Sequence, residues 1–216
     1  MVTTYTGLET GATFIGPTGL AFGSDGTLFV ADYNMGTLQL IDGSGAASLL
    51  AAFGPVGVAV DAKGVAYGNE TNRYLAFDAS GRRPFAGTGE AGFSGDGGPA
   101  VDAQFGLEVL GVAVGPQGQL YLGDPSNHRI RMVDAAGRIS TIAGTGASNH
   151  SGDGGPAIEA GLERPSSIAV DADGSVVFVD QSDWTVRRIG TDGRIETLAG
   201  GAATKTTGDC GPARRG

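Results

Sequence analysis

Residues 111–144 read GVAVGPQGQLYLGDPSNHRIRMVDAAGRISTIAG and contain four short apolar runs separated by turns. The first run meets a glycine turn at Gly118, and the second run ends on Asp124. A polar loop follows, and then come a third run, a second turn and a fourth run. Short runs rich in Val, Ile and Leu and bounded by glycine are typical of β-strands. The stretch therefore predicts four consecutive antiparallel strands joined by short connections.

The same pattern occurs four times along the chain. The units begin at Gly19, Gly57, Gly111 and Ser167. Each unit has a turn glycine after its first run, and these are Gly26, Gly64, Gly118 and Gly174. Short strands repeated in tandem at a spacing of about 40 residues are the signature of β-propeller blades. We therefore predict an all-β fold, a β-propeller of four-stranded blades with four repeats visible.

A glycine-rich segment after the second unit, AGTGEAGFSGDGGPA at 86–100, contains a G-x-G-x-x-G at Gly87, Gly89 and Gly92. Such a motif holds a dinucleotide only where it opens a long helix. The copy at 143–157 has Asn149 in place of Gly92, and neither copy leads into helical spacing. What recurs, also in the copy at 199–213, is Ser/Thr-Gly-Asp-x-Gly-Pro-Ala. This is turn chemistry, in which Asp bonds backbone N–H groups ahead of it and Pro begins one helical turn.

Composition excludes several function classes. The 216 residues include 40 Gly, and hydrophobic residues at 40% indicate a folded, turn-rich chain. A net charge of −9 predicts no nucleic-acid partner. A single cysteine, Cys210, excludes an intramolecular disulfide and a multi-cysteine zinc site. No apolar run is long enough for membrane insertion by the visible chain, and the first residues do not read as a signal peptide.

The segment GDPSNHRIRMVD, residues 123–134, resembles an NHL repeat at Asn127 and His128. The joining segment AGTG…SGDGGPA is similar to that of secreted and cell-surface NHL-repeat propellers. The resemblance is strongest at 107–201 and weaker at 17–85. It implies a propeller, most often of six blades, that serves mainly as a binding platform and lies outside the cytoplasm. Some relatives of this superfamily are lyases or lactonases with a metal in the central channel.

Four repeats are fewer than this ring needs, so we expect a fragment of a six-bladed propeller. The alternatives are several chains that complete one ring and a small ring that closes on itself. An open propeller exposes blade faces, which favours self-association. We expect a single propeller segment divided as follows: the outer strand of a preceding blade at 2–15, blades at 16–53, 54–88, 107–146 and 164–201, glycine-rich insertions at 89–106 and 147–163, and the start of a truncated repeat at 202–216.

In such a blade, the loop between the second and third strands shares an edge with the connection to the next blade. This edge carries the candidate binding residues Tyr33, Asn127, His128 and Trp184. It also carries the acids that end the second strands, which are Asp32, Glu70, Asp124 and Asp180. These acids either bond turn N–H groups or pair with Arg129, Arg131 or Arg187, or they converge as a ring for a divalent cation.

Three aromatic side chains on this edge leave alternatives open. Trp184 is either a contact anchor or a residue that packs between blades. His128 is expected to pack or to support a turn, with a metal ligand as the alternative. His150 has no periodic partner and is expected to be solvated.

The visible residues offer no catalytic constellation. There is no G-x-S-x-G motif, and two histidines leave little choice of general base. We therefore assign no catalytic residue and no cofactor other than a candidate divalent cation. The sequence predicts a scaffold that binds a protein or a small ligand through its loop-rich face. The alternative is a metal-dependent propeller lyase or a lactonase-like enzyme.

Overall fold

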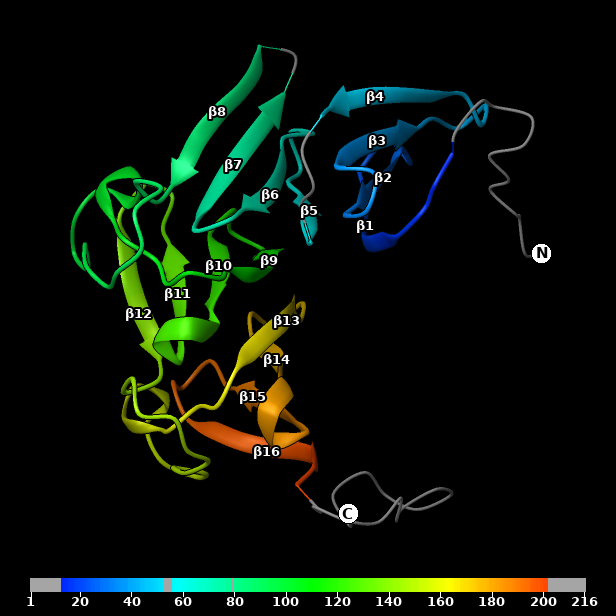
Figure 1. Cartoon of the computed structure of the whole chain (residues 1–216). Helices are drawn as coiled ribbons and strands as arrows, with labels where there is room; N and C mark the ends of the chain where they lie inside the picture. Colours follow the sequence, from blue (N-terminus) through cyan, green and yellow to red (C-terminus); the bar gives the residue numbers. More distant parts are fainter. Residues whose placement is uncertain (1–12, 53–55, 79, 202–216) are drawn as a thin grey trace, which may run out of the picture. The chain divides into compact units, whose positions relative to one another are not determined.

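The computed structural model describes residues 13–52, 56–78 and 80–201. Within these residues, sixteen strands form four separate four-stranded sheets (Figure 1). In each sheet the strands follow one another in chain order and pair antiparallel with their neighbours. This is the up-and-down meander of a propeller blade, and the prediction of an all-β, propeller-type fold is confirmed.

The first sheet contains β1 (Pro17–Phe22), β2 (Leu28–Asp32), β3 (Thr37–Ile41) and β4 (Ala47–Ala51). The second contains β5 (Val58–Val60), β6 (Ala66–Glu70), β7 (Arg73–Asp78) and β8 (Gly81–Ala86). The third contains β9 (Leu110–Val114), β10 (Leu120–Asp124), β11 (Arg129–Val133) and β12 (Ile139–Ala143). The fourth contains β13 (Pro165–Val170), β14 (Val176–Asp180), β15 (Thr185–Ile189) and β16 (Ile195–Gly200).

Four short 3-10 helices lie between strands of the second half of the chain. They are η1 (Ala100–Asp102), η2 (Pro125–Asn127), η3 (Ala157–Glu159) and η4 (Gln181–Asp183). η1 and η3 follow Pro99 and Pro156, where the sequence predicts at most one helical turn. Proline at this point has the backbone angle that a helix start needs and lacks the N–H group that would be left unbonded.

The turn between the first and second strands of each sheet depends on one glycine. Gly118 has φ +81°, and its N–H donates to the carbonyl of Gly115 at 2.9 Å. Gly174 has φ +92° and makes the same bond to Asp171. A residue with a Cβ is strained in this left-handed region, which explains why a glycine recurs there in every unit.

The chain divides into two compact units. Unit 1 holds most of the first two sheets, and unit 2 holds the last two sheets with the two glycine-rich insertions. The core of unit 1 includes Phe29, Leu38, Leu75 and Phe77. The core of unit 2 includes Tyr121, Ile130, Leu162, Phe178 and Ile195. Each buried side chain of this size contributes about 1.5–3 kcal/mol to folding.

Two predicted segments lie largely or wholly outside the described residues. They are the outer strand expected at 2–15 and the truncated repeat expected at 202–216 with its third Gly-Asp-x-Gly-Pro sequence. The expected division of the rest of the chain and the ring of six blades stay predictions.

Candidate functional site

Each sheet has two edges that differ in their connections. The "loop edge" carries the connection between the second and third strands and the glycine-rich insertions, and the "turn edge" carries the two tight turns. The candidate residues of the sequence lie at the loop edge. Both insertions belong to unit 2.

The acids at the ends of the second strands hold the chain that leads into the same sheet. Asp124 is fully buried, and its carboxylate accepts the N–H of Gly106 at 2.9 Å. Asp180 is also fully buried and accepts the N–H groups of Glu163 at 3.0 Å and Arg164 at 2.5 Å. These carboxylates satisfy backbone donors that burial would otherwise leave unbonded. Bonding of backbone N–H groups is the first of the three tasks that the sequence allows.

Unit 1 repeats this arrangement with one change of residue. Asp32 is buried and accepts the N–H groups of Ile15 at 2.7 Å and Gly16 at 3.0 Å. In the next sheet the acceptor is Asn69, which takes the N–H groups of Val56 and Gly57, and not Glu70. Glu70 instead faces Arg82 at 3.4 Å on the surface. The sequence pattern missed Asn69 because it aligned the acids one residue further along.

The buried acids have different titration behaviour. Burial is the largest influence on Asp32 and acts to raise its pKa, but the backbone donors of Met35, Ile15 and Gly16 together bring the pKa below its usual value. Burial raises the pKa of Asp124, against the opposing effect of its bonds to Asn127 and Gly106. Among the described residues, no group of three His, Cys, Asp or Glu side chains is arranged to hold a metal ion. The divalent cation stays an untested prediction.

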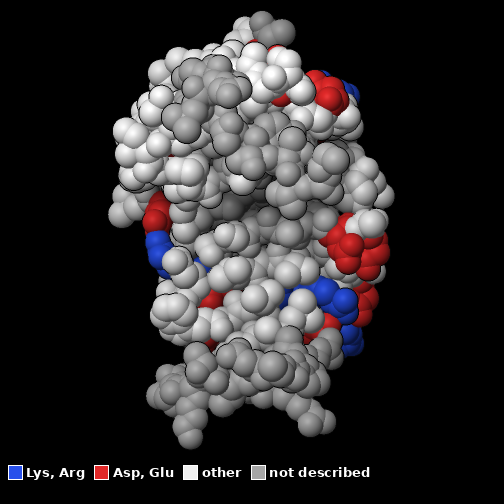
Figure 2. All heavy atoms as spheres, turned by 90° about the vertical axis from the view of Figure 1, so that its right-hand side faces the viewer, with Lys and Arg blue, Asp and Glu red and all other residues white. Residues whose placement is uncertain are grey.

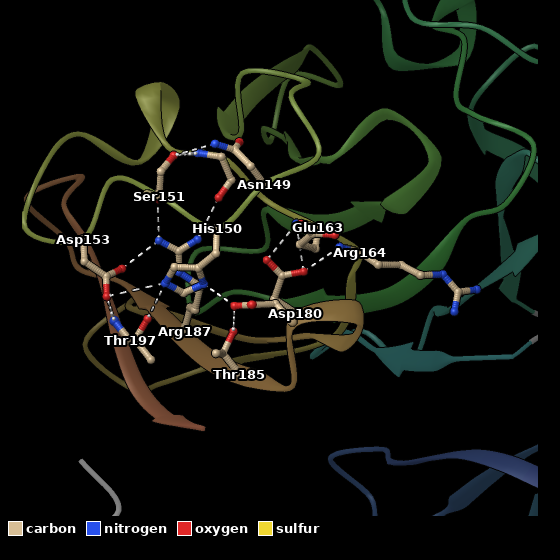
Figure 3. A network of polar contacts seen from close by, with 12 residues as sticks. Asn149, His150, Ser151, Asp153, Glu163, Arg164, Asp180, Thr185, Arg187 and Thr197 are labelled. Carbon is tan, nitrogen blue, oxygen red and sulfur yellow. Dashed lines mark hydrogen bonds and ion pairs between the residues drawn. The ribbon is translucent and has the colours of Figure 1, made fainter. Parts of the chain in front are cut away.

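Two arginines fix the insertions to the sheets of unit 2. Arg131 on β11 is fully buried, and its guanidinium lies 2.7 Å from Asp96 and 3.7 Å from Asp124. Arg187 on β15 is fully buried as well and lies 2.7 Å from Asp153 (Figure 3). The sequence predicts Arg131 and Arg187 as partners of the strand-end acids, but their closest acids belong to the insertions. The Asp of the Gly-Asp-x-Gly-Pro sequence therefore binds an arginine, a partner that the sequence pattern did not predict for it.

Asn127 and His128 have their side chains engaged within unit 2. The amide of Asn127 donates to Asp124 at 2.8 Å and to the carbonyl of Gly92 at 2.8 Å. The Nδ1 atom of His128 lies 2.6 Å from the carbonyl oxygen of Glu163, which precedes the next sheet. His128 also has φ +54°, a left-handed backbone that few residues other than glycine adopt. Both residues therefore tie the loop to neighbouring backbone, and a ligand-binding role for them stays a prediction.

Trp184 and Tyr33 are the two candidate binding residues with exposed aromatic rings. Trp184 occupies the position that His128 occupies in the preceding sheet. It has φ +56° and is 80% exposed. Tyr33, in unit 1, is 58% exposed. Whether Trp184 is a contact anchor or packs between blades stays a prediction.

His150 has partners that sequence reasoning missed. Figure 3 shows its ring beside Asp153 and Thr197. Its Nδ1 contacts the carboxylate of Asp183, and its Nε2 lies 3.4 Å from the Thr197 hydroxyl and 4.0 Å from Asp153. Aligning the two insertions would have given the signal, because Phe93 becomes His150 where Asn127 becomes Asp183. His150 is exposed, as expected, but it is also held by these partners.

Charged side chains of both signs are visible on the face in Figure 2. Acidic and basic side chains lie next to each other there, with uncharged surface between these groups. The structure places no helix of sufficient length and apolarity to cross a membrane among the residues that it describes.

A match to a known protein family falls largely within the part of the chain where the sequence pattern is strongest. The teneurin NHL domain family matches residues 145–211. Over these residues the chain is similar to a family of NHL-type repeats. Teneurin-1 of Gallus gallus is 34% identical over 110 residues, which is 44% of this chain and 4% of that protein. The NHL resemblance is confirmed, and the chain corresponds to a small part of this relative.

Solved structures share the fold at low sequence identity. A nidogen/laminin complex is similar with a TM-score of 0.63 and 18% identity, over 86% of this chain and 65% of the other. A streptogramin B lyase is similar with a TM-score of 0.57 and 17% identity, over 85% of this chain and 54% of the other. At these identities the likeness shows the fold alone. An NHL propeller fold supports a binding scaffold at this general level, because its loops lie on a rigid frame.

Proposed function

We propose that the chain is a protein-binding scaffold that contacts its partner through the loop edge of unit 2, with Trp184 as the anchoring side chain. The observation that carries this proposal is the 80% exposure of a tryptophan whose backbone is fixed in a left-handed turn. Tryptophan is enriched among the residues that dominate binding energy at protein interfaces. A fixed backbone reduces the conformational entropy that is lost on binding.

The loop that carries Trp184 is held on both sides. Asp183 contacts His150 of the insertion and accepts the Thr185 hydroxyl at 3.2 Å. Gln181 accepts a hydrogen bond from Arg164 at 2.7 Å. Within the part of the chain that the structure describes, the Trp184 side chain makes no hydrogen bond or ring contact, and its ring faces solvent. These contacts support a preorganised contact point rather than a mobile one.

The chemistry of the surface supports a protein partner. The net charge of −9 disfavours a phosphate backbone, and charges of both signs are interspersed on the face in Figure 2. The likeness in fold to a nidogen/laminin complex is compatible with this role. The likeness to a streptogramin B lyase is equally a likeness in fold, and no observation on the described residues favours the metal-dependent lyase or lactonase-like alternative.

A crosslinking experiment tests the proposal. A photoreactive phenylalanine derivative is placed at position 184, and in a second preparation at Ala62, an exposed residue in a tight turn of unit 1. We expect a specific crosslinked protein from the source cells only with the probe at 184. For that purified protein, Trp184→Ala should weaken binding by about 2 kcal/mol, roughly 30-fold.

Two results would contradict this function. One is equal crosslinking from positions 184 and 62. The other is an affinity that Trp184→Ala leaves unchanged. Leu49→Ala, which truncates a 61% exposed side chain on β4, is the control for the loss of exposed apolar surface in general.

A further inference from the structure

A cavity of about 600 Å³ lies at the turn edge of unit 2, between the sheets β9–β12 and β13–β16. Its apolar lining is formed by Tyr121, Met132, Ile142, Ile158, Val176 and Ile189. Ile158 belongs to η3 of the second insertion and is 47% exposed. Cavities of this size and composition are typical of small-molecule sites.

Polar residues also line the cavity, among them Gln117, Gln119 and Thr191. The side chain of Gln119 donates to the hydroxyl of Tyr121 at 3.2 Å and accepts the N–H of Gln117 at 3.0 Å. Asp173 is the charged residue among those that line the cavity. Its two carboxylate oxygens accept hydrogen bonds from the N–H and the hydroxyl of Ser175, at 2.7 and 3.0 Å. These bonds hold the carboxylate in one position in the turn.

The charge of Asp173 is available to a ligand. The bonds from Ser175 lower the pKa of Asp173, so the group is ionised at neutral pH. Arg188, whose charge also acts in this direction, has its guanidinium 2.7 Å from Glu196. Each oxygen of Asp173 accepts one of these bonds and has a further lone pair.

The equivalent position in another sheet holds a larger side chain. The third strands of the four sheets carry Ile41, Phe77, Val133 and Ile189 at equivalent positions close to the turn that follows. In unit 1, Phe77 is 2% exposed and packs in a cluster with Phe29 and Ala66. Ile189 is smaller than phenylalanine, and the cavity lies beside it.

We propose that this cavity binds a small organic cation, an aromatic or branched aliphatic group that carries an ammonium. The apolar part occupies the space among Tyr121, Met132 and Ile158, and the ammonium pairs with Asp173. This site lies at the turn edge, and it does not depend on the proposed function of the loop edge.

The test uses 2-phenylethylamine as the probe and 2-phenylethanol as its uncharged counterpart, with binding followed by amide NMR. Gly174, Gly190 and Gly193 line the cavity, and their signals should shift on titration. We expect the amine to bind about fivefold more tightly than the alcohol, as one exposed ion pair provides. Equal affinities, or shifts that spare these glycines, would overturn the proposal.

Two variants with matched controls separate the parts of the site. Asp173→Asn should remove the preference for the amine, whereas Asp25→Asn should keep it, because Asp25 bonds Thr27 in unit 1 just as Asp173 bonds Ser175. Ile189→Phe should fill the cavity and remove binding of both probes. Ile41→Phe makes the same change in unit 1 and should leave binding intact.

The remaining outcomes are equally decisive. Binding that survives in a folded Ile189→Phe protein would place the probe elsewhere and overturn the proposal. If Ile189→Phe fails to fold, the comparison of Asp173→Asn with Asp25→Asn still decides the case. Trp184→Ala should leave the affinity for 2-phenylethylamine unchanged, so failure of the scaffold function and failure of this site give different results.

Discussion

The two glycine-rich insertions of unit 2, residues 89–106 and 147–163, attach to their sheets in the same way but differ at their tips. In the first, the N–H of Gly97 donates to Ile139 at 2.8 Å, and that of Ala100 to Gly137 at 2.8 Å. In the second, the N–H groups of Gly154 and Ala157 make the corresponding bonds to Ile195 and Gly193, at 2.7 and 2.8 Å. A buried arginine completes each attachment. The main-chain frame is therefore reproduced bond by bond.

The tips use different chemistry at equivalent positions. In the first insertion the ring of Phe93 lies 3.9 Å from the guanidinium carbon of Arg129, and Asn127 bonds the backbone beside it. In the second, His150 replaces Phe93, and its ring contacts Asp183, which replaces Asn127. Thr185 stands in place of Arg129. The three exchanges fit one another, since a cation stacks on an aromatic ring in one tip and an imidazole meets an acid in the other.

This comparison separates two kinds of constraint. The Gly-Asp-x-Gly-Pro-Ala sequence and its buried arginine specify how an insertion attaches. The residues at the tip vary as a set, and they adjoin the loops that carry His128 and Trp184. The part of the insertion that can adapt to a ligand is therefore the part nearest the proposed contact residue.

The largest expected effect comes from the buried arginines. Arg131→Met should lower the free energy of unfolding by about 3–5 kcal/mol, because it leaves the fully buried Asp124 without its nearby cation. Arg187→Met should cost less, about 2 kcal/mol, because its acid partner Asp153 is 40% exposed and the main loss is hydrogen bonds. Urea unfolding of both variants measures the difference.

The pH dependence sharpens this prediction. Because burial raises the pKa of Asp124, the carboxyl takes up a proton as the pH falls through that raised value. Protonation removes the uncompensated charge of Asp124 in the variant. The difference in the free energy of unfolding between wild type and Arg131→Met should therefore become smaller from about pH 7 to about pH 4. Equal losses in the two arginine variants, or a deficit that grows toward low pH, would contradict the assigned role of Asp124.

A smaller effect is expected from two glycines two residues apart in the second insertion. Gly152 has φ +92°, and an added Cβ would lie 2.8 Å from Ala160. Gly154 has φ +80°, with nothing within 4 Å of an added Cβ. Gly154→Ala should cost about 1–2 kcal/mol for the left-handed backbone alone, and Gly152→Ala about 1–3 kcal/mol more for the clash.

Thermal unfolding checks this pair, and Gly95→Ala with Gly97→Ala provides the matched test in the first insertion. Gly95 has φ +94° and an added Cβ would lie 2.6 Å from Ala103, while Gly97 is open. Equal costs within either pair would show that backbone strain, and not packing against the small alanine, requires the first glycine.

Much of the fold was predictable because it rests on local signals. Turn glycines such as Gly118 and alternating apolar runs specify the strands, and Pro99 and Pro156 mark the single helical turns. The attachment of the insertions was not predictable from spacing. Arg131 and Asp96 are 35 residues apart in the chain, and only folding shows that the arginine turns toward the insertion.

The candidate site was predicted in position but only partly in role. The acids at the loop edge were identified, yet Asn69 was missed because the connection from β6 to β7 is a short turn and shifts the acceptor by one residue. Trp184 was found from its place in the repeat, while its exposure depends on a backbone conformation that the sequence does not reveal. The partners of His150 were missed because a loop histidine was considered alone and not with the acid that replaces Asn127.

The smallest expected effect is the coupling at the tips. In an Asp183→Asn background, the variants His150→Phe, Thr185→Arg and the two together convert the second tip into the first. The two changes should be coupled favourably by about 0.5–1 kcal/mol, because the new guanidinium can stack on the new ring as Arg129 does on Phe93. Additive effects in urea unfolding would mean that the tips differ without any energetic link between their residues. A measured coupling would instead explain why Phe93 and Arg129 are exchanged together in the second insertion. Exchange of either residue alone loses the stacking contact between the ring and the guanidinium.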